Sequence, residues 1–182
     1  MTDELRGDRI TLRPLTKEDL VLLHAWLNDP EIMQYWDGRD HPATFDRVET
    51  RFRKSVDGSD RDAHRYMIEV EDAGKKRCIG LIQYARVHTR AKNSQLDVLI
   101  GDPAFRDGGY GADAVHVLLA HLFVGLKLHR VWFTIRANNE RAMRSAERVG
   151  FVREGVLREH DQLEGQLVDV AVYGMLRREW KG

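Results

Sequence analysis

The chain has 182 residues, 42% of them hydrophobic, and its 29 basic and 29 acidic residues leave a formal net charge of +0. This length predicts one domain, spanning residues 1–182, with a core large enough to need no disulfide. The balanced charge argues against a nucleic-acid partner held by bulk electrostatics. Cys78 is the single cysteine, which excludes a disulfide framework and a thiolate metal cluster, and we expect no metal site.

Membrane and export signals are not expected in this sequence. No apolar run approaches the ~20 residues of a membrane span, and residues 1–4 do not begin a signal peptide. We therefore expect a cytoplasmic protein with no membrane partner.

Apolar periodicity and turn residues predict the elements in chain order. The first half is expected to contain a strand at 9–15, a helix from the N-cap Thr16, a short turn at 32–36, a helix at 45–56, and strands at 65–70, 78–87 and 94–100. The second half is expected to contain a glycine-rich loop, helices at 112–126 and 139–149, a strand at 130–137, and a final pair of strands hinged at residues 164–165. This order predicts an α/β (α+β) fold with a mixed, mostly antiparallel sheet of about seven strands.

The glycine-rich loop is Arg106-Asp107-Gly108-Gly109-Tyr110-Gly111-Ala112, between the predicted strand and an amphipathic helix. Strand, glycine loop and helix together are typical of a phosphate site, because free amides and the helix dipole favour an anion and glycines allow close approach. Ala112 follows Gly111, whereas a P-loop needs Lys and then Ser or Thr. A dinucleotide fold would place the loop after an early strand. Taken alone, the glycines also fit a tight turn.

Several segments resemble the GNAT family of N-acetyltransferases. Arg106, Gly109 and Gly111 form an Arg-x-x-Gly-x-Gly pattern similar to the family's pyrophosphate loop. A strand at 131–135 and a helix that opens with Asn-Asn-Glu-Arg-Ala at 138–142 and ends at Gly150-Phe151 resemble the segment that follows it. Residues 9–15, 32–36 and 154–180 resemble the subgroup that contains ribosomal-protein N-terminal and polyamine acetyltransferases. The resemblance covers nearly the whole chain in the right order.

This resemblance implies a GNAT fold, with helices on both faces of the sheet and splayed central strands at 96–100 and 131–136. It implies an N-acetyltransferase that uses acetyl-CoA, in which a polyamine-like amine or a protein N-terminus attacks the acetyl group directly in a ternary complex. Loop amides would hold the pyrophosphate, and amides near Leu99 would stabilise the oxyanion. The implied cofactor contacts are Leu99, Ile100, Arg106, Asp107, Gly108, Gly109, Tyr110, Gly111, Ala112 and Asn139. The resemblance implies a homodimer as one assembly and leaves the oligomeric state open.

A base is needed more than an acid in this reaction. Deprotonating an alkylammonium of pKa ~10.4 at pH 7 costs about 4 to 5 kcal/mol, whereas protonating a thiolate of pKa ~8.5 gains about 2 kcal/mol. Asp97 is the first candidate base, although strand alternation equally allows it to point outward. Relatives carry a Tyr, the proposed acid, where this chain has Ala146, so Ser145 and water are the candidate acids.

The acceptor is expected to contact residues between 35 and 65 and the last hairpin. The candidate substrate contacts are Tyr35, Trp36, Asp37 and Asp169. The acidic residues of this region suit a cationic amine, but interleaved basic residues favour a solvated mixed-charge surface instead. A helix N-cap is the alternative role for Asn139, and a structural hydrogen bond is the alternative for Asp169.

Two other functions stay open at this point. One is a catalytically weak acyl-CoA-binding sensor, which the missing tyrosine at Ala146 favours. The other is an antibiotic-modifying acetyltransferase of the aminoglycoside type, built on the same fold.

Overall fold

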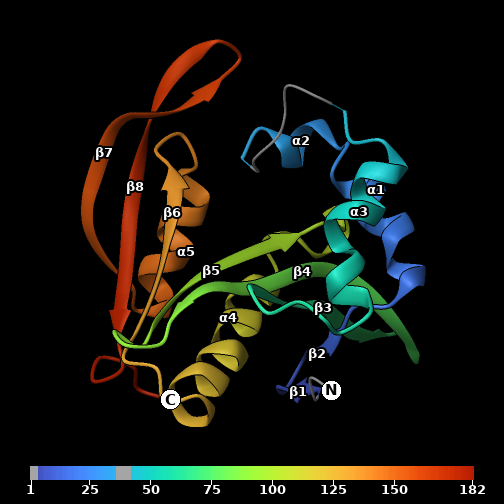
Figure 1. Cartoon of the computed structure of the whole chain (residues 1–182), viewed down its shortest axis with the longest axis horizontal. Helices are drawn as coiled ribbons and strands as arrows, with labels where there is room; N and C mark the ends of the chain where they lie inside the picture. Colours follow the sequence, from blue (N-terminus) through green and yellow to red (C-terminus); the bar gives the residue numbers. More distant parts are fainter. Residues whose placement is uncertain (1–3, 36–41) are drawn as a thin grey trace.

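The computed structural model describes residues 4–35 and 42–182. These residues form one eight-stranded sheet in the order β1-β2-β3-β4-β5-β6-β8-β7 (Figure 1). Its strands are β1 (Leu5–Arg6), β2 (Thr11–Pro14), β3 (Ala63–Asp72), β4 (Lys75–His88), β5 (Asn93–Ile100), β6 (Arg130–Arg136), β7 (Val152–Leu163) and β8 (Gln166–Leu176). Only β5 and β6, among these pairs, run parallel. The predicted mixed, mostly antiparallel sheet is confirmed, and the strand added to the expected seven is the two-residue β1.

Helices cover both faces of the sheet, as predicted (Figure 1). The helices on one face are α1 (Leu20–Trp26), α2 (Pro30–Met33) and α3 (Phe45–Val56), and those on the other are α4 (Tyr110–Ala120) and α5 (Glu140–Val149). A 3-10 turn at Lys17–Asp19 precedes α1, and a π-helical turn at His121–Gly125 extends α4. None of the helices in the described ranges combines the length and the apolar character that crossing a bilayer requires.

Two apolar clusters, one on each side of the sheet, show which face each side chain of β5 occupies. On β5, Leu96 and Val98 pack with α4 and α5 in the first cluster. Leu99 packs with α1, α2 and α3 in the second cluster. Because strand residues alternate between faces, Asp97 shares the face of Leu99 and lies on the side of α1, α2 and α3. Alternation thus decides which side of the sheet the candidate base occupies.

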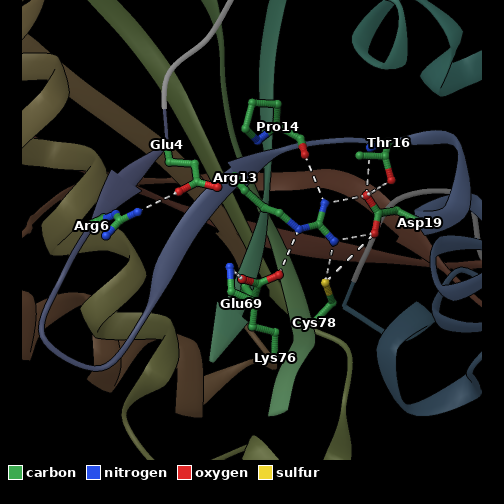
Figure 2. Close-up of polar contacts among 9 residues, drawn as sticks. All are labelled: Glu4, Arg6, Arg13, Pro14, Thr16, Asp19, Glu69, Lys76 and Cys78. Carbon is green, nitrogen blue, oxygen red and sulfur yellow. Dashed lines mark hydrogen bonds and ion pairs between the residues drawn. The ribbon is translucent and has the colours of Figure 1, made fainter. Parts of the chain in front are cut away.

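A network of charged side chains joins the start of the helical layer to the sheet (Figure 2). The Arg13 guanidinium on β2 donates to both carboxylate oxygens of Asp19 at 2.7 Å each and to Glu69 on β3 at 3.1 Å. The Thr16 amide donates to the same Asp19 carboxylate at 2.8 Å, which fulfils the predicted N-cap position. Arg13 also donates to the sulfur of Cys78. Burial acts to raise the pKa of Asp19, but hydrogen bonds from Arg13 and Thr16 outweigh it and hold the pKa below its usual range.

Replacing Arg13 with alanine is expected to lower the free energy of unfolding by about 3 to 5 kcal/mol, because Asp19 would be left charged and buried. The Asp19 residue is 4% exposed. Urea denaturation measures the loss. The matched control is Arg6→Ala, whose side chain is 80% exposed in an ion pair with Glu4, and which is expected to cost at most about 1 kcal/mol. Equal losses in the two variants would contradict the buried-pair interpretation.

The same pair makes stability depend on acid pH. Because the pKa of Asp19 is lowered in the folded chain, its contribution is complete above the unfolded-state pKa of about 3.9. The contribution is lost as the pH falls through the lower, folded value. Acid unfolding of Arg13→Ala is therefore expected to depend less steeply on pH in this range.

Candidate active site

The central strands β5 and β6 separate along their length (Figure 1). Their parallel ladder consists of three pairs, Asn93 with Arg130, Ser94 with Val131, and Gln95 with Trp132. Beyond Gln95 and Trp132 the two strands diverge, which confirms the predicted splay. Main-chain groups of the two strands there do not pair with each other and are placed to bind a ligand between them.

The glycine-rich loop follows β5 and leads directly into α4. Gly109 is the N-cap of α4 and has a φ of 83°, in the left-handed region that favours glycine. A Cβ built on Gly109 would lie 3.1 Å from the Arg9 guanidinium. The first helical amides, from Tyr110 onward, have no intrahelical acceptor and carry the positive end of the helix dipole. This geometry suits an anion at the loop.

Arg106, the first residue of the loop motif, is engaged by protein groups. Its guanidinium donates to the carbonyl of Gly101 at 2.9 Å and that of Ile100 at 3.4 Å. It also pairs with Asp29 at 3.1 Å and with Glu31 at 2.5 Å, two carboxylates at the start of α2. The side chain is 11% exposed. Arg106 therefore joins the loop to the end of β5 and to α2, and its contact with a diphosphate stays a prediction.

Two other cations lie at the loop and were not expected from the sequence. The Arg9 guanidinium donates to Asp113 at 2.7 Å and to the carbonyl of Gly108 at 3.2 Å. Arg141 on α5 lies 3.4 Å from the Asp107 carboxylate. Arg9 is 104 residues from its partner on α4, so no local pattern reveals it. Arg141 lies inside the segment at 138–142 that resembles the family, and this resemblance was the available signal.

Asp97 lies on β5 two residues beyond Gln95, where the ladder with β6 ends. Its carboxylate accepts hydrogen bonds from the Gln83 amide at 2.9 Å and from the Gln95 amide at 3.3 Å. The residue is half-buried on the sheet face covered by α1, α2 and α3. An acceptor approaching the splay from that face would meet this carboxylate.

Asn139 and Asp169 both make the structural hydrogen bonds that were considered as alternatives. The Asn139 side chain accepts from the Ala142 amide at 3.1 Å and caps the start of α5. The Asp169 carboxylate accepts from the Glu159 amide at 2.8 Å and supports the bulge where Glu159 has a φ of 52°. Their contacts with cofactor and substrate stay predictions.

The remaining predicted site residues are dispersed. Ala146 is buried on α5 in the cluster that includes α4, and Ser145 beside it is half-buried. Tyr35 is exposed just after α2. Trp36 and Asp37 lie outside the described residues.

Arg136 was missed by the sequence analysis and connects the two sides of the splay. This residue at the end of β6 is 7% exposed. Its guanidinium pairs with Asp161 of β7 at 2.5 Å and donates to the carbonyl of Gln34 at the end of α2 at 3.2 Å. The hydrogen bond from Arg136 holds the pKa of Asp161 below its usual range. The last hairpin and α2 are thus bound to one buried cation.

Comparison with known proteins agrees with this geometry. Residues 9–152 match a family model described as an acetyltransferase (GNAT) domain. The chain is 29% identical over 164 residues to a spermidine N(1)-acetyltransferase of Vibrio cholerae serotype O1, covering 90% of this chain and 91% of that protein. It is 25% identical over 156 residues to an aminoglycoside N(6')-acetyltransferase type 1 of Klebsiella pneumoniae, covering 83% and 78%.

A solved structure extends the likeness to three dimensions. The crystal structure of the Vibrio cholerae spermidine N-acetyltransferase in complex with CoA and spermine superposes with a TM-score of 0.83 at 26% identity, covering 95% of this chain and 98% of that one. The family model, the splayed strands and the loop before α4 agree. The chain belongs to the GNAT family of N-acetyltransferases, which use acetyl-CoA as the acetyl donor.

Proposed function

We propose that this enzyme transfers the acetyl group of acetyl-CoA to a primary amine of a polyamine, by direct attack in a ternary complex with Asp97 as the base. The observation that carries the mechanism is the position of the Asp97 carboxylate, half-buried beside the splay on the face opposite α4. The polyamine is supported by the similarity to spermidine acetyltransferases.

In this proposal acetyl-CoA binds with its diphosphate at the glycine-rich loop and its acetyl group in the splay between β5 and β6. The amides at the start of α4 bind the diphosphate, and Arg9 and Arg141 add positive charge beside them. Gly101 donates its amide to Ile79 on β4. Because amides along a strand point alternately to its two neighbours, those of Val98 and Ile100 are expected to face the splay. These two amides, on either side of Leu99, are the proposed oxyanion donors.

The chemical step follows from these positions. Asp97 takes one proton of the substrate ammonium, the amine nitrogen forms a bond with the acetyl carbon, and the carbon–sulfur bond breaks to release the CoA thiolate. The nitrogen then loses a second proton, which protonates the thiolate directly or through water. Removing the ammonium proton at pH 7 is the larger requirement, about 4 to 5 kcal/mol for a pKa of ~10.4. Protonating the thiolate gains only about 2 kcal/mol. An enzyme with Ala146 in place of a tyrosine acid therefore loses the smaller of the two contributions and keeps the larger one, which the base supplies.

An acceptor screen tests the proposal. Purified enzyme is given acetyl-CoA with spermidine, spermine, an aminoglycoside or an N-terminal peptide, and release of free CoA thiol is followed. We expect the highest kcat/KM with a polyamine. The aminoglycoside is included because of the similarity to the Klebsiella pneumoniae enzyme. A higher kcat/KM with the aminoglycoside than with a polyamine would contradict the proposed substrate class. Tight acetyl-CoA binding without thiol release from any acceptor would instead identify a sensor.

A further inference from the structure

A row of polar side chains crosses three strands and ends at Asp97. Arg65 on β3 lies directly opposite Gln83 on β4, and Gln83 lies directly opposite Asp97 on β5. The Arg65 Nε donates to Gln83 Oε1 at 2.8 Å, and Gln83 Nε2 donates to Asp97 Oδ2 at 2.9 Å. The row shares the sheet face of Leu99, under α1, α2 and α3.

The far end of the row is held firmly. Arg65 Nη1 pairs with Asp60 at 2.6 Å and donates to the Ser55 hydroxyl of α3 at 2.7 Å. Asp60 in turn accepts the amides of Asp62 and Ala63, at 3.1 Å each. The side chains of Arg65 and Asp60 are 14% and 11% exposed. The ion pair with Asp60 and the hydrogen bond to Ser55 therefore hold the Arg65 guanidinium in the orientation in which its Nε faces Gln83.

The chemistry of arginine settles the orientation of Gln83. A guanidinium has donors only, so the atom that receives its hydrogen bond is the oxygen of the Gln83 amide. The NH2 group of Gln83 must then point to Asp97, which accepts through Oδ2.

We infer that Gln83, oriented by Arg65, is a positioning residue that aims the Asp97 carboxylate for proton removal. This inference rests on the proposed role of Asp97 as the base. The donor to Oδ2 fixes one carboxylate oxygen and leaves Oδ1, whose protein partner is the longer 3.3 Å contact with Gln95, for the substrate ammonium. The charged groups on this side of β3 and β6 include Arg65, paired with Asp60, Glu69, paired with Arg13, Arg130, paired with Glu154, and Arg136, paired with Asp161.

The separate effects of substitutions on kcat and on KM test the inference. Gln83→Met keeps the length of the side chain but removes the donor, so kcat is expected to fall roughly tenfold. Gln83→Glu accepts from Arg65 but turns a second carboxylate toward Asp97, so its kcat is expected to fall at least as far. The KM for acetyl-CoA is expected to stay unchanged in both variants.

Two further variants separate positioning from folding. Ser94→Ala removes a buried 2.6 Å hydrogen bond to the Ala85 carbonyl between the same two strands, and is expected to lower stability without lowering kcat. Arg65→Lys keeps the charge near Asp60, but its single ammonium does not reproduce the guanidinium fork that orients Gln83. We expect kcat to fall as it does in Gln83→Met. This variant also tests the inference if Gln83→Glu fails to fold.

The outcomes distinguish this inference from the proposed function. If Asp97→Asn is inactive while the Gln83 and Arg65 variants keep the wild-type kcat, the positioning role is wrong and the base assignment stands. If Asp97→Asn retains wild-type kcat, the base assignment itself is wrong, and the inference falls with it.

Discussion

Gly109→Glu is expected to weaken acetyl-CoA binding by at least about 100-fold, the cost of losing two or more charged hydrogen bonds. Gly109 is the N-cap of α4 with a φ of 83°, and the new carboxylate would occupy the place of the diphosphate next to the Arg9 guanidinium. The added negative charge therefore competes with the ligand for the same amides and the same cation. Isothermal titration calorimetry with acetyl-CoA measures the loss.

Two control variants separate charge from backbone strain. Gly109→Ala places a Cβ at the same left-handed position and is expected to cost only about 1 to 2 kcal/mol of stability. Gly74→Glu makes the same charge change in the turn between β3 and β4, at a φ of 75° with no atom within 4 Å of the new Cβ. Neither control is expected to weaken binding strongly. Unchanged affinity in Gly109→Glu would mean that the diphosphate binds elsewhere.

Asp97→Asn is expected to lower kcat by about 100-fold to 10,000-fold, the usual contribution of a positioned base. Its affinity for acetyl-CoA is expected to remain, because the amide is nearly the same size as the carboxyl group. Without a base the enzyme depends on amine that is already neutral, so its rate should rise about tenfold per pH unit up to the amine pKa of ~10.4. Steady-state release of CoA thiol across this pH range measures both effects.

The matched control is Asp72→Asn, which removes an exposed carboxylate paired with Arg77 at the β3–β4 turn. We expect wild-type kinetics from this variant. A wild-type kcat in Asp97→Asn, with the polyamine as acceptor, would show that another group or solvent removes the proton.

Local patterns predicted the parts of this molecule that local interactions build. The order of β5, the glycine loop and α4 could be read from alternating residues, glycines and helical spacing, and the capping positions of Thr16 and Asn139 follow the same logic. The two-residue β1 was missed because alternation needs a longer strand. The helix expected from Thr16 begins with a 3-10 turn, because Asp19 turns back to the Thr16 amide.

Contacts between distant segments could not be predicted in this way. The partners of Asp97 depend on the register of β3, β4 and β5, which one sequence does not reveal. Arg106 is the arginine of the loop motif and was expected at the diphosphate. Its side chain is instead oriented by Asp29 and Glu31, more than 70 residues earlier in the chain. The candidate site was therefore predictable as a set of segments, whereas the directions of its side chains required the fold.

The contacts of Arg106 have a consequence for how the two substrates affect each other. One partly buried cation bonds to the carbonyls of Ile100 and Gly101 at the end of β5 and to two carboxylates at the start of α2. The donor loop and the α2 side of the splay therefore cannot shift independently without breaking charged hydrogen bonds. Arg136 fastens the other end of α2 to the last hairpin. We therefore expect a displacement of the donor loop to strain the contacts at both ends of α2.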